Sequence, residues 1–343
     1  MPVPESDHRL ANAVRATVVY ADLFDFPLRR DEIHRDLIGT TTTVAETNHA
    51  IQAAAAAGDL TFSGDFVVLP GRADLRALRR VRSARAARLW PTARRFGGII
   101  AAVPFARVVA VTGSLAADNP SEGADLDYLV VTAPGRLWLV RAMAIAVVRL
   151  ARPLGVRLCP NYLLSSRALM LDHDDLFTAH ELLQAVPIAG SATYLRMLAS
   201  NRWARRWLPN RFRQAENTGP VASSVGLARR AAEAVLAGSL GDRLEGWEAR
   251  RKRRRLGEVD TSARFTADLC EGYFGNHRLR VLQDFALRCA HLGITPSIAD
   301  DSPARHRERG VEGLATGPRL LTRAPTSLRL AAPIVVGDTE RPS

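Results

Sequence analysis

The chain has 343 residues, of which 47% are hydrophobic and 24% are charged, the usual composition of a globular protein with room for two or three small domains. The net charge of +12 is carried almost wholly by arginine, since Lys252 is the only lysine. This excess fits a polyanionic partner such as nucleic acid, and it fits equally the bias of a GC-rich coding sequence. The charge alone therefore selects no function class.

Three widely spaced cysteines exclude a disulfide framework and a zinc-finger pattern. The N-terminal residues lack the apolar core of a signal peptide. The most apolar stretch, 137–150, is interrupted by Arg141 and Arg149 and is too short to cross a bilayer. We therefore expect a cytoplasmic protein without membrane attachment.

Residues 1–71 have the element order of a winged helix-turn-helix domain. Hydrophobic periodicity predicts helices at 9–24, 31–37 and 44–57, followed by two β-rich runs within 60–69. The third helix would read DNA in such a domain, but it carries no arginine or lysine. We therefore favour packing or oligomerisation over sequence-specific DNA binding.

Residues 72–98 are predicted to form an arginine-rich helical connector. Arg72, Arg76, Arg79 and Arg80 share one helix face. This face is either solvated or turned toward bound phosphate, and we favour the solvated connector.

Residues 99–190 alternate strands and helices and are the predicted core of an α+β fold. Strands are predicted at 107–112, 126–131 and 156–164, with helices beginning at Ser114 and Leu137. Beyond the core the pattern predicts helices at 174–186, 191–206, 223–240, 242–256 and 261–292, the last one broken near 272–275. We expect a helical C-terminal domain at 191–296 and a disordered tail at 297–343.

The most specific motif begins where the first core strand ends, at Gly113-Ser114, and continues with Asp125 and Asp127 after a ten-residue spacer. Glycine lets the backbone approach a phosphate closely, and Ser114 offers a hydroxyl and free backbone N–H groups at a helix start. The two aspartates leave one face of a strand because they are two residues apart. Paired carboxylates beside bound phosphate suit Mg²⁺, or Mn²⁺ in its place, so both are predicted metal ligands.

This pattern resembles the polymerase-β-type nucleotidyltransferase superfamily over residues 108–165. Further segments, PheAspPhePro, GlyArgLeuTrpLeuValArg and CysProAsnTyrLeu, resemble a bacterial group of nucleotidyltransferase-domain proteins. The resemblance implies a small mixed sheet with flanking helices, a winged-helix-like N-terminal domain and a helical C-terminal domain. It also implies transfer of a nucleoside monophosphate from a nucleoside triphosphate to a hydroxyl acceptor, with Gly113, Ser114, Asp125 and Asp127 in the family's roles.

The chain departs from the family at the strand 156–164. Active members carry a third carboxylate there, commonly as the base for the attacking hydroxyl. This strand has no acid, and Asn161 or Cys159 occupies the corresponding face. Asn161 can bind Mg²⁺ through its carbonyl oxygen but cannot accept a proton.

Four acids later in the chain are candidates for the missing carboxylate. Glu181 is one, and the other three lie at the N-terminus of the predicted helix 174–186: Asp172, Asp174 and Asp175. For these three we favour the simpler interpretation that they complement the helix dipole.

Two arginine groups are further candidates. Arg136 and Arg141 begin the helix after the metal strand and are predicted to contact triphosphate oxygens, although exposed arginines are common there. The basic run 250–255 suits single-stranded nucleic acid or tRNA, and equally a charged helix end.

The leading hypothesis is a Mg²⁺-dependent nucleotidyltransferase whose acceptor is a small molecule or RNA. The alternative is a catalytically weak or inactive regulatory protein that binds nucleotide or nucleic acid.

Overall fold

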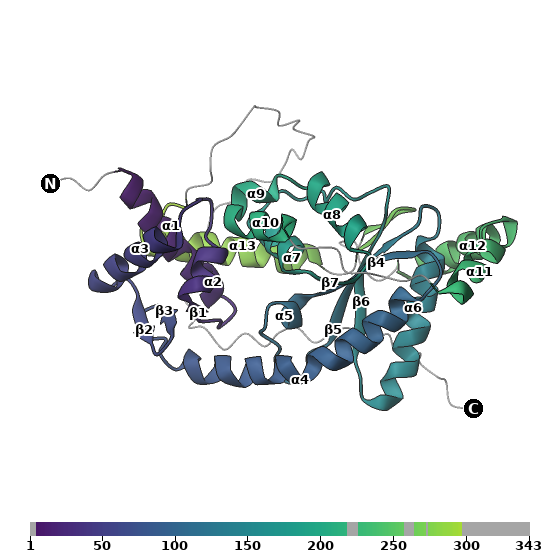
Figure 1. The fold of residues 1–343 in the computed structure, drawn as a ribbon, viewed down its shortest axis with the longest axis horizontal. Helices are drawn as coiled ribbons and strands as arrows, with labels where there is room; N and C mark the ends of the chain where they lie inside the picture. The colour runs from purple at the N-terminus through teal and green to yellow at the C-terminus, as the bar shows by residue number, and fades with distance from the viewer. Residues whose placement is uncertain (1–4, 218–225, 257–263, 272–273, 297–343) are drawn as a thin grey trace, which may run out of the picture. The chain divides into compact units, whose positions relative to one another are not determined.

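A six-stranded mixed sheet with helices on both faces forms the centre of the computed structural model, which describes residues 5–217, 226–256, 264–271 and 274–296 (Figure 1). The strand order is β7-β4-β5-β6-β9-β8, and within it only β5 and β6 run parallel to each other. The bounds are β4 (Ala106–Thr112), β5 (Leu126–Thr132), β6 (Leu158–Ser165), β7 (Val186–Ala189), β8 (Arg264–Phe265) and β9 (Leu269–Glu271). The α+β class and the mixed sheet with flanking helices are therefore confirmed.

Side-chain alternation along β4 and β5 separates the flanking helices into two layers. Val109 and Val130 pack on the side of α4 and α6, whereas Val108 and Val131 pack on the side of α7 and α8. Since both sides are covered, both strands read as nearly continuous apolar runs. The helices are α4 (Leu75–Ala101), α5 (Gly113–Ala116), α6 (Leu137–Ala151), the 3₁₀ turn η1 (Arg152–Leu154), α7 (Leu176–Gln184) and α8 (Ser191–Ser200).

The N-terminal elements form a smaller unit around a three-stranded sheet of order β1-β3-β2. Its three helices and its β2–β3 hairpin confirm the predicted elements, and β1 is an addition to them. A capping box between Thr43 and Glu46 explains where α3 begins. The bounds are α1 (Glu5–Asp22), β1 (Leu28–Arg29), α2 (Arg30–Arg35), α3 (Val44–Ala56), β2 (Thr61–Ser63) and β3 (Phe66–Val68).

The region 191–296 is not wholly helical, which corrects the expectation for it. In place of a helix from residue 261, β8 and β9 extend the central sheet, and Cys270 of β9 pairs with Leu163 of β6. The edge of β6 offers unpaired backbone groups, so this pairing satisfies them while Cys270 is buried in the core. The helices here are α9 (Ala204–Trp207), α10 (Pro209–Glu216), α11 (Leu227–Leu236), α12 (Ser239–Leu256) and α13 (Phe274–His291).

A second difference concerns the predicted helix 174–186, which ends at Gln184. The chain continues as β7, in which Pro187 pairs with Ala110 at the edge of the sheet. Proline lacks the N–H that a helix interior needs, but an edge strand tolerates it. The predicted tail 297–343 lies outside the described residues.

None of the described helices combines the length and the apolar character that crossing a bilayer requires.

Candidate functional site

Strand register brings the two halves of the Gly113–Asp127 motif together at one end of the sheet. Thr112, the last residue of β4, lies opposite Asp127 of β5 in the antiparallel pair. Asp127 in turn lies opposite Cys159 of β6 in the parallel pair. The motif and β6, the strand without an acid, are therefore immediate neighbours.

Gly113 packs directly against the carboxylate of Asp127. Its φ of +64° lies in the left-handed region, which residues with a Cβ rarely adopt. A Cβ added to Gly113 would clash with Asp127 Oδ2 and stand 3.1 Å from its Cγ. Both the backbone conformation and the close approach therefore require glycine at this position.

Ser114 follows in the one-turn helix α5. Its carbonyl oxygen accepts a hydrogen bond from the backbone N–H of Asn119, at 2.8 Å. Its hydroxyl forms no hydrogen bond with another described residue. The hydroxyl thus remains available to a ligand beside Gly113.

Asp125 and Asp127 have different electrostatic surroundings. Asp125 forms an ion pair with Arg157, at 2.5 Å from Nε. Asp127 has no ion pair with a described cation, and burial, followed by the charges of Glu181 and Asp125, raises its pKa to about 8. The site therefore holds more acidic groups than described cations paired with them.

Asn161 and Cys159 both contact Asp127, as their place on β6 predicts. Asn161 Nδ2 donates to Asp127 Oδ1 at 3.1 Å, while its own Oδ1 is buried without a hydrogen-bond partner. The Cys159 thiol also hydrogen-bonds to Asp127, and burial together with the nearby carboxylates raises its pKa to about 12. A neutral thiol and an amide with one unused acceptor therefore border the carboxylate.

Helix α7 places an acid near Asp127. Glu181 lies close enough to Asp127 to raise the pKa of that carboxyl, and burial raises the pKa of Glu181 itself to about 7. Glu181 forms no ion pair or hydrogen bond with a described residue. The sequence signal for Glu181 was a lone acid within the apolar helix that follows β6.

A pocket lies on this face of the sheet, between β6 and α7. It encloses about 70 Å³, where one water needs roughly 10–15 Å³ on the same measure, so it admits several water-sized groups. Its polar wall includes Thr112, Asn161, Thr178 and Glu181, and its apolar wall includes Leu129, Phe177, Leu182 and Met197. The pocket therefore joins Glu181 and Asn161 to an apolar surface, while Asp125 and Asp127 are not part of its lining.

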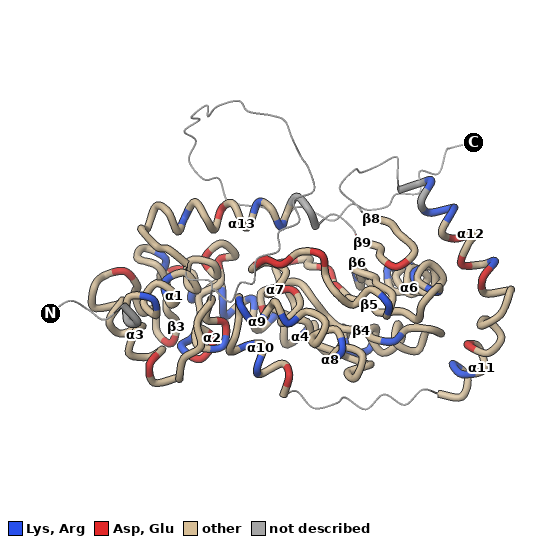
Figure 2. Tube along the Cα trace, turned by 90° about the horizontal axis from the view of Figure 1, so that it is seen from above, with Lys and Arg blue, Asp and Glu red and all other residues tan. Residues whose placement is uncertain are grey.

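The three aspartates before α7 take different roles. Asp175 caps the helix by accepting from the Thr178 N–H at 2.9 Å, as the dipole interpretation predicts, and also pairs with Arg278. Asp174 pairs with Arg206, and Asp172 lines the pocket. Figure 2 shows how acidic residues concentrate on the segment that leads into α7.

Arg136 and Arg141 lie away from these acids, which corrects their assignment to the nucleotide site. Both belong to the α6 side of the sheet, opposite the α7 side where the pocket lies. Arg136 follows the far end of β5 and forms an ion pair with Asp242 at 2.7 Å, and Arg141 hydrogen-bonds to Cys270. Helix α6 covers the face of β5 opposite the one that carries Asp127.

The candidate site is thus formed by Gly113, Ser114, Asp125, Asp127, Asn161 and Glu181. No three His, Cys, Asp or Glu side chains among the described residues converge as a complete metal-ligand set. Comparison of the chain with protein-family models, with curated proteins and with solved structures finds no match.

Proposed function

We propose that the protein is a Mg²⁺-dependent nucleotidyltransferase that moves a nucleoside monophosphate from a nucleoside triphosphate to a hydroxyl acceptor. The observation that carries this proposal is the buried Asp127 carboxyl against Gly113, whose pKa is raised by burial and by the nearby charges of Glu181 and Asp125 and which has no ion pair with a described cation. Acids are crowded at a cost in stability, and such crowding is frequent where they serve a function.

The residues present fit a divalent cation. Mg²⁺ takes oxygen ligands, usually one or two protein carboxylates together with substrate phosphates. Asp125 and Asp127 would provide the carboxylates, and the unpartnered Oδ1 of Asn161 would provide a further oxygen. A Mg²⁺ ion that is shared with a triphosphate takes its remaining ligands from the phosphates, so the protein's own ligand set is incomplete. Bound Mg²⁺ would supply charge stabilisation for the phosphates.

Glu181 is suited to act as the general base. A base works best when its pKa lies near the working pH, and burial raises the pKa of Glu181 to about 7. It lines the pocket that we assign to the acceptor. In the transfer, the acceptor oxygen forms a bond to the α-phosphorus, the bond from the α-phosphorus to the bridging oxygen breaks, and pyrophosphate leaves. Glu181 takes the proton of the acceptor hydroxyl.

The test is pyrophosphate release from each nucleoside triphosphate with Mg²⁺ or Mn²⁺, against panels of small polyols and RNAs. We expect the wild type to release pyrophosphate, and Asp127→Asn and Glu181→Gln to lose most of this activity. The matched control is Asp174→Asn, which neutralises an acid paired with Arg206 outside the site. Absence of both Mn²⁺ binding and pyrophosphate release in the wild type would contradict the proposal.

One observation favours the regulatory alternative, in which the protein binds nucleotide or nucleic acid without turnover. Arg157 already neutralises Asp125, so a cation at Asp125 must compete with an arginine. Calorimetry distinguishes the two proposals, because nucleotide binding that is tight, insensitive to metal and not followed by turnover supports the alternative.

A further inference from the structure

The loop 117–124 joins the two halves of the site, since α5 precedes it and Asp125 follows it. Asp118 in this loop has a φ of +56°, a conformation that costs energy for any residue with a Cβ. Its side chain accepts from Ser83 Oγ at 2.7 Å, and its carbonyl oxygen accepts from Arg79 Nη1 at 3.1 Å. Helix α4 therefore holds Asp118 in this conformation.

The next two loop residues are bound to the same helix. Arg82 Nη1 donates to Asn119 Oδ1 at 2.9 Å, and Arg85 Nη1 donates to the carbonyl oxygen of Pro120 at 3.0 Å. The backbone N–H of Asn119 donates in turn to the carbonyl oxygen of Ser114. A displacement of the loop on α4 would therefore move Ser114 directly.

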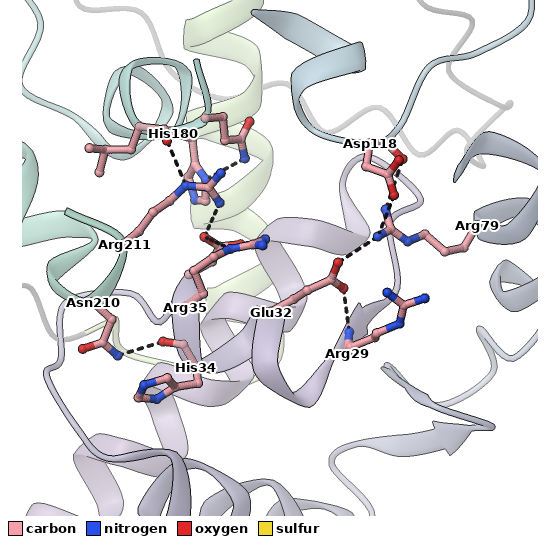
Figure 3. Close-up of polar contacts among 12 residues, drawn as sticks. Arg29, Glu32, His34, Arg35, Arg79, Asp118, His180, Asn210 and Arg211 are labelled. Carbon is pink, nitrogen blue, oxygen red and sulfur yellow. Dashed lines mark hydrogen bonds and ion pairs between the residues drawn. The ribbon is translucent and has the colours of Figure 1, made fainter. Parts of the chain in front are cut away.

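The arginine that holds Asp118 is also bound to the N-terminal unit. Arg79 is 2% exposed, and its Nη2 lies 2.8 Å from Glu32 Oε1 and 3.1 Å from Asp118 Oδ2. Its guanidinium stacks on the ring of Phe26 at 3.7 Å. Figure 3 shows Arg79 between Glu32 of α2 and Asp118 of the loop, with Glu32 bound in addition to Arg29.

We propose that Arg79 and Asp118 are positioning residues, through which the N-terminal unit holds the loop 117–124 and fixes Ser114 relative to Asp125. The inference rests on the proposed function, because it assigns this clamp to the proposed metal and nucleotide site. Arg79, Arg82 and Arg85 of α4 thus contact the loop beside the site. Arg80 and Arg88 of the same helix are exposed, as expected of a solvated connector.

The test compares Asp118→Asn with Asp25→Asn in the full chain. Asparagine tolerates the left-handed conformation and still accepts from Ser83, so Asp118→Asn removes only the charge that faces Arg79. Asp25 is the matched control because it also has a positive φ and also pairs with an arginine, Arg72. Its side chain has no ion pair or hydrogen bond with a described residue of the loop. Amide hydrogen exchange is followed over residues 113–125, and Mn²⁺ affinity is measured by electron paramagnetic resonance.

In the Asp118→Asn variant we expect amide hydrogens over 113–125 to exchange about tenfold faster and Mn²⁺ to bind several-fold more weakly. Both effects correspond to the loss of about one charged hydrogen bond. The Asp25→Asn variant should show neither effect. Glu32→Gln should act in the same direction from the N-terminal unit. Ser83→Ala is the second variant if Asp118→Asn fails to fold.

Three results would overturn the clamp. Unchanged exchange over 113–125 would show that Asp118 does not hold the loop. Faster exchange with unchanged Mn²⁺ affinity would show that the loop does not position the site. Both results leave the proposed function intact, whereas a wild type that neither binds Mn²⁺ nor releases pyrophosphate would overturn the proposed function and the clamp with it.

Discussion

Gly113 and the carboxylate of Asp127 are in direct contact, so closely that a methyl group on Gly113 would overlap Asp127 Oδ2. This contact joins the turn that ends β4 to the aspartate at the start of β5. Any ligand that reaches Gly113 therefore also reaches Asp127. The two halves of the motif act as one site because of this contact.

Gly113→Ala should destabilise the protein more than the same change at another left-handed glycine. Gly135 has a φ of +67° and open space where a Cβ would stand, so Gly135→Ala should cost only the conformational term, about 1–2 kcal/mol. Gly113→Ala adds the clash with Asp127 and should also weaken Mn²⁺ binding. Chemical denaturation and Mn²⁺ titration measure both effects, and equal losses of stability at the two sites would contradict this interpretation of the contact.

Asp127→Asn should stabilise the metal-free protein while abolishing Mn²⁺ binding. The pKa of Asp127 is raised to about 8 in the folded protein, so the folded protein keeps a proton that the unfolded chain releases above about pH 4. Keeping this proton should cost about 2 kcal/mol or more at pH 8, and Asp127→Asn removes that cost. The gain should grow as the pH rises from 5 to 8. Asp125→Asn is the control and should give no such gain, because Arg157 already compensates Asp125. Thermal unfolding in the presence of a chelator measures the difference.

Arg79→Met should cost far more stability than Arg206→Met, although both remove an arginine from an ion pair. Arg79 and Glu32 are buried, so losing Arg79 leaves an uncompensated charge at a cost of about 3–5 kcal/mol. Arg206 and Asp174 have side chains 38% and 40% exposed, so that pair should contribute about 0–1 kcal/mol. Urea unfolding curves of the two variants provide the comparison. Similar unfolding midpoints would show that solvent compensates the charge that Arg79→Met leaves on Glu32.

Substituting His180 should reduce the loss of stability in mild acid. His180 is buried, stacks on Tyr20 at 4.4 Å, and has its pKa lowered to about 3 by burial. The unfolded chain takes up a proton on this histidine below pH 6.5 and the folded protein does not, so stability falls by about 2 kcal/mol between pH 7 and 5. Phenylalanine keeps the stacking and removes the proton.

The measurement is the free energy of unfolding at pH 7 and pH 5 for the wild type and His180→Phe. The raised pKa values of Asp127 and Glu181 act with the opposite sign over this range, but they do so in both proteins. The difference between the two pH profiles therefore reports on His180, and identical profiles would contradict its burial as a neutral ring.

Local patterns predicted most elements of this fold because their causes are local. Helix α3 begins at Val44 in the prediction and in the structure, where a capping box at Thr43 fixes this start. The apolar runs predicted the extents of β4 and β5 to within one residue. The wrong predictions concern elements whose conformation depends on a partner that is distant in the sequence. Residues 269–271 became a strand because β6 presented an unpaired edge, which no pattern within 261–292 indicates.

The sequence by itself determined Gly113, Ser114, Asp125 and Asp127 as one candidate site, because the spacing of a strand, a turn and a second strand is enough to bring them together. It could not determine which side of the sheet each following helix covers. Tertiary packing decided that α6 takes Arg136 and Arg141 to the face opposite Asp127, and that α7 brings Glu181 to the same face. Ion pairs likewise determined what α4 contacts. Arg79 is buried between Glu32 and Asp118, two partners that are far from it in sequence.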